Sequence, residues 1–146
     1  MLHTRASLGD TRKYSMPFTI LVIDDDPLIL EMATELLAEK GHRALSALGG
    51  SEGLTQARAE RPDLILLDYH MPRIDGLAVV QRLKADAVTR RIPVVALTSG
   101  TGDQANALIR AGCIGFIPKP FEPAEFLQIV SEILDATAGR RQHPGR

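Results

Sequence analysis

Between residues 17 and 136 the chain alternates short apolar runs with longer amphipathic segments, five times over. The short runs are rich in β-branched residues and are typical of buried strands, whereas the longer segments place apolar residues at helical spacing. Repeated strand–helix units build a parallel sheet, because each pair of parallel strands needs a long crossover connection. The sequence therefore predicts an α/β fold with strands at Phe18–Ile23, 42–48, Leu64–Leu67, Ile92–Leu97 and Ile114–Ile117.

A helix is expected to follow each of these strands. The first helix is the best marked, because Asp26 can cap its amino terminus, Pro27 suits its first turn and Gly41 can end it. The second helix is expected to begin with a cap at Ser51 and the third with a cap at Asp75. The fourth is expected over roughly 103–111 and the fifth over Pro123–Ala136.

The two ends of the chain differ from its body in charge. Between residues 17 and 136 there are 11 Lys and Arg residues against 17 Asp and Glu residues, whereas residues 1–16 and 137–146 are both basic. Because the excess charge is small and divided between two ends, we expect solvated, disordered tails rather than nucleic-acid-binding arms. Met16 directly precedes the first strand and is an alternative start of translation.

Composition excludes several classes of protein. No apolar run approaches the length of about 18 to 20 residues that a membrane helix needs, and no signal-peptide pattern opens the chain. A cytoplasmic protein without membrane contact is expected. The single cysteine, Cys113, excludes an internal disulfide and a multi-cysteine metal site, and it is expected to pack at a strand edge.

Polar side chains follow four of the predicted strands at the point where each strand ends. The carboxyl ends of parallel strands meet at one edge of the sheet, and ligands of such folds bind there, where the strand order reverses. Residues far apart in the sequence are therefore expected at one rim: Asp24, Asp25 and Asp26 after the first strand, Asp68 after the third, Thr98 after the fourth and Lys119 after the fifth.

These residue types indicate phosphoryl chemistry. Clustered carboxylates repel one another, so they either raise their pKa values or bind a cation. Oxygen ligands in this number suit Mg²⁺, which keeps several waters and takes a phosphate oxygen, whereas Ca²⁺ requires more protein oxygens. Lys119 and Thr98 can orient a phosphoryl group, and a carboxylate can accept that group covalently.

The rim residues lie in four motifs, which are Leu21–Pro27, Leu64–Gly76, Val94–Gly100 and Gly115–Phe121. In this order they resemble the motifs of the receiver domain of bacterial two-component response regulators, and the resemblance covers about residues 17–136. The fold that it implies is a flavodoxin-like, doubly wound (βα)5 sandwich with strand order 2-1-3-4-5.

The resemblance implies a role for each residue of the rim. Asp68 would be the phosphoacceptor, and Thr98 and Lys119 would bind phosphoryl oxygens. The metal would be Mg²⁺, with Mn²⁺ as a substitute, and the Lys119–Pro120 peptide bond would be cis. The metal ligands would be Asp24, Asp25, Asp68 and the backbone carbonyl of His70, while Asp26 is expected to be the helix cap, with a role as a ligand as the alternative.

The resemblance also implies a switch and its partners. Phosphorylation would rearrange the loop at Thr98 and let the ring of Phe116, which stands where tyrosine is common in the family, turn inward. The face made by the fourth helix, the fifth strand and the fifth helix would then bind a downstream protein. The phosphoryl donor would be a histidine kinase or a histidine phosphotransfer protein, and the chain would be a monomer or a phosphorylation-linked dimer. The side chain of His70 is a hypothetical modulator of aspartyl-phosphate hydrolysis.

Two other functions remain open at this point. Asp24 and Asp26 form the Asp-x-Asp pair of phosphatases that resemble the haloacid-dehalogenase superfamily, although this chain lacks a second acidic pair at a strand end beyond Lys119. An unphosphorylated docking module on the same fold is the other alternative. The chain is expected to be a single-domain regulator, or otherwise a fragment of a longer regulator or hybrid kinase.

Overall fold

The computed structural model describes residues 17–100 and 102–142, in which five strands alternate with five helices. All five strands are parallel and form one sheet in the order β2-β1-β3-β4-β5, as predicted. The elements are β1 (Thr19–Asp24), α2 (Pro27–Glu39), β2 (Arg43–Leu48), α3 (Gly50–Glu60), β3 (Leu64–Asp68), α4 (Gly76–Ala85), β4 (Val94–Thr98), α5 (Gly102–Ala111), β5 (Gly115–Pro118) and α6 (Pro123–Gln142).

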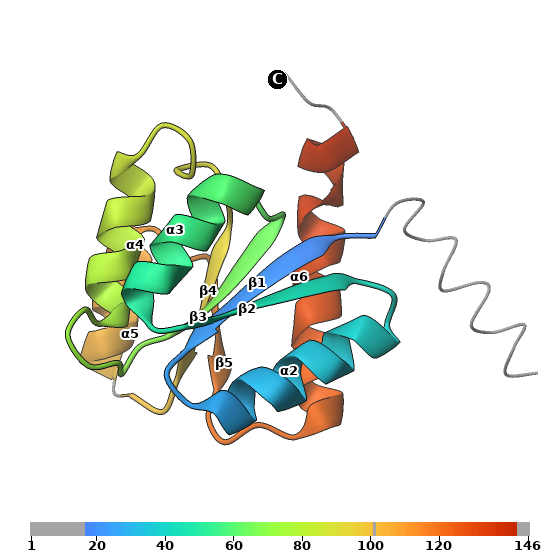
Figure 1. Ribbon diagram of the computed structural model, residues 1–146. Coiled ribbons are helices and arrows are strands. Elements are labelled where there is room, and N and C mark those ends of the chain that lie inside the picture. The colour runs from blue at the N-terminus through green and yellow to red at the C-terminus, as the bar shows by residue number, and fades with distance from the viewer. Residues whose placement is uncertain (1–16, 101, 143–146) are drawn as a thin grey trace, which may run out of the picture.

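Helices cover both faces of the sheet, with α2 and α6 on one side and α3, α4 and α5 on the other (Figure 1). Successive residues of each strand point to opposite faces, so the two faces have separate cores. Ile20, Val22 and Leu66 pack with the α2–α6 layer, whereas Ile23 and Leu67 pack with the α3–α5 layer. Because β3 lies at the centre, all five of its residues are buried, including Asp68 at its end.

Helix capping follows the sequence at two predicted positions and departs from it at a third. Asp26 and Asp75 cap α2 and α4, accepting hydrogen bonds from the backbone N–H of Leu28 and Ala78 respectively. The predicted cap at Ser51 is wrong, because α3 begins at Gly50 with Gly49 at the cap position, and no side chain caps the helix there. A Cβ on Gly50 would lie 2.5 Å from Cγ2 of Ile74, so only glycine allows this approach.

Several strand boundaries differ from the prediction by a single residue, and two further boundaries differ by more. Strand β4 starts at Val94 rather than Ile92, since Pro93 has no N–H to donate to the sheet. Helix α6 continues to Gln142, beyond the predicted end at Ala136, and Ala138 packs against the core on its side of the sheet. The predicted amino-terminal extension, residues 1–16, and the last four residues, 143–146, lie outside the described residues.

Candidate functional site

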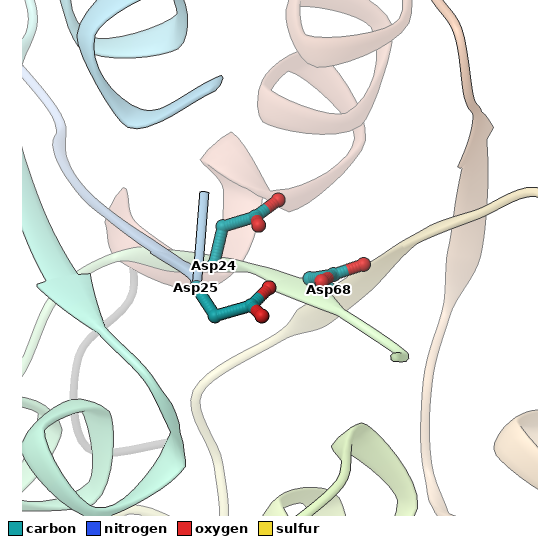
Figure 2. Close-up of side chains that lie close together, drawn as sticks. All are labelled: Asp24, Asp25 and Asp68. Carbon is teal, nitrogen blue, oxygen red and sulfur yellow. The ribbon is translucent and has the colours of Figure 1, made fainter. Parts of the chain in front are cut away.

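Three carboxylates meet at the carboxyl edge of the sheet. Strands β1 and β3 are parallel neighbours with Ile23 opposite Leu67, so the residues that follow, Asp24 and Asp68, are adjacent across the two strands. One carboxylate oxygen from each of Asp24, Asp25 and Asp68 lies within 4.8 Å of the others. Figure 2 shows the three side chains extending from the ends of these strands into the same region. Their convergence is what the topology of the predicted sheet requires.

Burial makes two of these carboxylates unusual. Asp24 and Asp68 are 0% and 2% exposed, whereas Asp25 is exposed. Burial, reinforced by the negative charge of Asp24, raises the pKa of Asp68 to about 6, although the nearby Lys119 ammonium opposes this. The cluster therefore carries unfavourable negative charge, which a bound cation would relieve.

The ammonium of Lys119 joins the two buried carboxylates. Its Nζ donates to Oδ2 of Asp24 at 3.0 Å and to Oδ1 of Asp68 at 3.1 Å. Burial alone would lower the pKa of Lys119, but the hydrogen bonds and charges of the two carboxylates outweigh it and the pKa is raised. The side chain of Lys119 therefore stays protonated. The backbone N–H of Lys119 donates to the backbone carbonyl of Thr98. The Lys119–Pro120 peptide bond is cis, the configuration that the resemblance implies.

Asp26 lies beside the carboxylate cluster, but its side chain makes different contacts. Its carboxylate accepts the N–H of Leu28 at 3.0 Å, and its own N–H donates to Oδ1 of Asp24 at 2.9 Å. It is not among the residues whose oxygens converge. The geometry therefore favours Asp26 as the cap of α2, and Asp24 and Asp25 as members of the carboxylate cluster.

The predicted switch residues lie near this rim on the β4 and β5 side. Thr98 ends β4 half-buried, and its Oγ1 accepts the N–H of Gly100 at 2.8 Å. Phe116 on β5 is half-buried and packs against the core under α3, α4 and α5. His70 is exposed, with its ring in edge contact with that of Tyr69.

Cys113 is buried away from solvent, and burial raises the pKa of its thiol to about 11, which makes the thiol unreactive.

Gly76 ends one of the four motifs, but its role at the site was not predicted from the sequence. Its N–H donates to the carbonyl of Tyr69 at 2.8 Å, and a Cβ at this position would lie 2.7 Å from the carbonyl oxygen of Asp68. The clash is with backbone, which cannot move aside as a flexible side chain can. Glycine therefore lets the start of α4 lie directly against the end of β3 and fixes the position of Asp68.

We expect Gly76→Ala to lower the free energy of unfolding by about 1 to 3 kcal/mol, because the new methyl group forces the two backbones apart. Urea unfolding measures this loss. Gly102→Ala is the matched control, since a Cβ there meets no atom of the described residues within 4 Å. Equal effects of the two substitutions would contradict the role given to Gly76.

The chain belongs to the response regulator receiver domain family, whose pattern matches residues 20–131. It is thus a signalling domain of two-component systems rather than a member of a classical enzyme family, and the phosphatase alternative is wrong. Among the residues described by the structure, no helix has both the length and the apolar character to cross a membrane.

Several known proteins are similar to this chain over most of its length. The polar-differentiation response regulator DivK of Brucella anthropi is 33% identical over 121 residues, which cover 82% of this chain and 98% of DivK. Protein PilH of Pseudomonas aeruginosa is 34% identical over 118 residues, covering 79% of this chain and 96% of PilH. The solved receiver domain of a Pseudomonas aeruginosa sensor histidine kinase, with magnesium coordinated in its active-site cleft, is 30% identical, with a TM-score of 0.71 and coverage of 80% of this chain and 96% of that domain.

Proposed function

We propose that this receiver accepts a phosphoryl group on Asp68 in a magnesium-dependent reaction. The observation that carries the proposal is the ammonium of Lys119 set between two buried carboxylates, with the third carboxylate, Asp25, beside them. This arrangement holds a nucleophile, a fixed positive charge and hard oxygen ligands within one small region. These are the parts that phosphoryl transfer needs, because its catalysis is mostly positioning and electrostatic stabilisation.

The donor set fits Mg²⁺. Three carboxylate oxygens within 4.8 Å offer hard ligands and excess negative charge, and the similar receiver solved with magnesium supports this assignment. Asp24, Asp25 and Asp68 would hold the ion together with the backbone carbonyl of His70, and Mn²⁺ would be able to replace it. When bound, the ion neutralises charge on the phosphoryl oxygens and on the carboxylates.

The transfer itself is a displacement at phosphorus. An Oδ of Asp68 supplies the electron pair of the new O–P bond, while the P–N bond of a donor phosphohistidine breaks and its electron pair stays on the imidazole. A pKa of about 6 leaves Asp68 mostly ionised near neutral pH, as a nucleophile must be. Lys119 pairs with one phosphoryl oxygen and the Thr98 hydroxyl donates to another. The donor would be a histidine kinase or a histidine phosphotransfer protein.

The consequence of phosphorylation would be a change on the face of α5, β5 and α6. Contact of Thr98 with the phosphoryl group would favour one arrangement of the β4–α5 loop, and Phe116 would turn inward. Ile109 on α5 and Ile114 just before β5 are each 48% exposed, which suits this face to a protein partner.

The proposal is tested by intact mass after incubation with acetyl phosphate and Mg²⁺. We expect a gain of one phosphoryl group in the wild type and in Asp103→Asn, an exposed control on α5. A chelator should abolish the gain. Absence of any gain, with phosphohistidine donors as well as acetyl phosphate, would favour the unphosphorylated docking module.

The choice of metal ligands has its own test. Asp26→Asn should bind Mg²⁺ as tightly as the wild type does, since asparagine still caps a helix, whereas Asp25→Asn should bind more weakly. Asp26→Ala should lose about 1 kcal/mol of stability, again without loss of metal affinity. Calorimetric titration with Mg²⁺ measures the affinities. Equal weakening in Asp25→Asn and Asp26→Asn would place Asp26 among the ligands.

A further inference from the structure

The loop between β4 and α5 contains a glycine whose side-chain position is already occupied. A Cβ at Gly100 would overlap with Oε1 of Gln104, in the first turn of α5, and would lie 2.9 Å from Oγ1 of Thr98. The φ of Gly100 is not in the left-handed region, so its backbone conformation does not require glycine. A larger residue here would displace the end of the flexible Gln104 side chain. The side-chain oxygens of Gln104 and Thr98 are therefore neighbours across Gly100.

Both of these oxygens have unused hydrogen-bonding capacity. Oε1 of Gln104 is buried and has no hydrogen-bond partner among the described residues. Oγ1 of Thr98 accepts the N–H of Gly100, and within the described part of the chain its own proton is donated to no acceptor. A hydroxyl donates one hydrogen bond and accepts up to two, so this proton is available to Gln104. A buried acceptor left unpaired is unfavourable, and rotation about side-chain bonds can bring the two groups into a hydrogen bond.

We propose that Gln104 is a positioning residue, whose Oε1 accepts the Thr98 hydroxyl proton in the resting receiver and competes for it with the phosphoryl group. The inference rests on the proposed function, because only there does Thr98 donate to a phosphoryl oxygen. The backbone of Thr98 is fixed, since its carbonyl accepts the N–H of Lys119 at 3.1 Å. Rotation of the Thr98 hydroxyl, and not movement of β4, therefore determines whether it donates to Oε1 of Gln104 or to a phosphoryl oxygen.

Competition for one proton predicts the direction of the effect. Gln104→Met keeps the volume of the side chain but removes the acceptor, so phosphoryl binding no longer has to break a resting hydrogen bond. Beryllium fluoride, a tetrahedral anion that binds a carboxylate as a phosphoryl group does, is the probe. With Mg²⁺ present, Gln104→Met should bind beryllium fluoride about fivefold more tightly than the wild type. This ratio of affinities corresponds to the net contribution of one hydrogen bond between uncharged groups.

A double-mutant cycle with Thr98→Val separates this role from a general structural one. In the Thr98→Val background, Gln104→Met should leave the affinity for beryllium fluoride unchanged, because the contested proton is gone. The same cycle on urea unfolding, without metal or anion, should show a coupling of about fivefold in the unfolding equilibrium constant. Gln128→Met, an exposed glutamine on α6, is the control for the substitution and should change neither the affinity nor the coupling.

The two measurements distinguish failure of the inference from failure of the proposed function. Additive effects on unfolding, or an equal gain in affinity with and without the Thr98 hydroxyl, would overturn the role of Gln104. An unchanged or weaker affinity in the single variant Gln104→Met would also overturn it. If the wild type binds no beryllium fluoride with Mg²⁺, the proposed phosphoacceptor function fails, whatever the unfolding cycle shows.

Discussion

Lys119→Met should lower the free energy of unfolding of the metal-free protein by about 3 kcal/mol at neutral pH, because it leaves two buried carboxylates without their counter-charge. Asp24 and Asp68 have side chains only 1% and 3% exposed, and each lies within 3.1 Å of the ammonium. Methionine has a similar length and no charge, so the loss reports on electrostatics rather than on a cavity. Urea unfolding with and without Mg²⁺ is the measurement.

The control for this substitution is an ion pair at the surface. Arg43 and Glu60 are also 3.1 Å apart, but their side chains are 57% and 38% exposed, so Arg43→Met should cost less than about 1 kcal/mol. Mg²⁺ should restore part of the stability of Lys119→Met, since the cation replaces the lost positive charge, and should leave the effect of Arg43→Met unchanged. Similar losses in the two variants would contradict the strong coupling described for Lys119.

The stability of the metal-free protein should also depend on the ionisation of Asp68. Its pKa is about 6 in the folded protein, against 3.8 for an ordinary aspartate, so the folded state binds this proton more tightly than the unfolded state does. The stability that this proton contributes is fully present below the unfolded pKa and is lost as the pH rises through about 6. At about 1.4 kcal/mol for each pKa unit, the loss is about 3 kcal/mol.

Asp68→Asn isolates this contribution, because asparagine has nearly the same shape and does not ionise. The variant should be more stable than the metal-free wild type, by a margin that grows as the pH rises from about 3.8 and levels off above about pH 7. Urea unfolding across this pH range measures the margin. Excess Mg²⁺ should reverse the order, since it stabilises the wild type by binding and has one ligand fewer in the variant. A margin that does not change with pH would contradict the raised pKa of Asp68.

The strands, the helix caps and the edge of the sheet that carries the site could be predicted from the sequence, because they depend on local patterns. The apolar run before Asp68 is too short for a helix and indicates a buried strand, and the polar residues after each strand had to meet at one edge once the strands were parallel. Asp26 and Asp75 could be predicted as caps for the same reason, since capping depends on the residue and its nearest neighbours.

Other features of the site could not be predicted, because they depend on contacts that exist only once the loops at the sheet edge have folded. The sequence left a ligand role for Asp26 open as the alternative to the cap, and only the course of the backbone from β1 into α2 shows that its carboxylate stays outside the cluster. The need for glycine at Gly76 comes from the carbonyl of Asp68, eight positions earlier in the chain. Gln104 is the same kind of case, because only the folded loop shows that its amide occupies the space beside Gly100.

Whether Asp68 is the phosphoacceptor can be determined by locating the modified residue. After reaction with acetyl phosphate and Mg²⁺, borohydride reduces an aspartyl phosphate to homoserine, which peptide mass mapping can place in the sequence. We expect homoserine at position 68 alone, and none when a chelator is present. Conversion at position 24, 25 or 26, or phosphorylation that persists in Asp68→Asn, would contradict it.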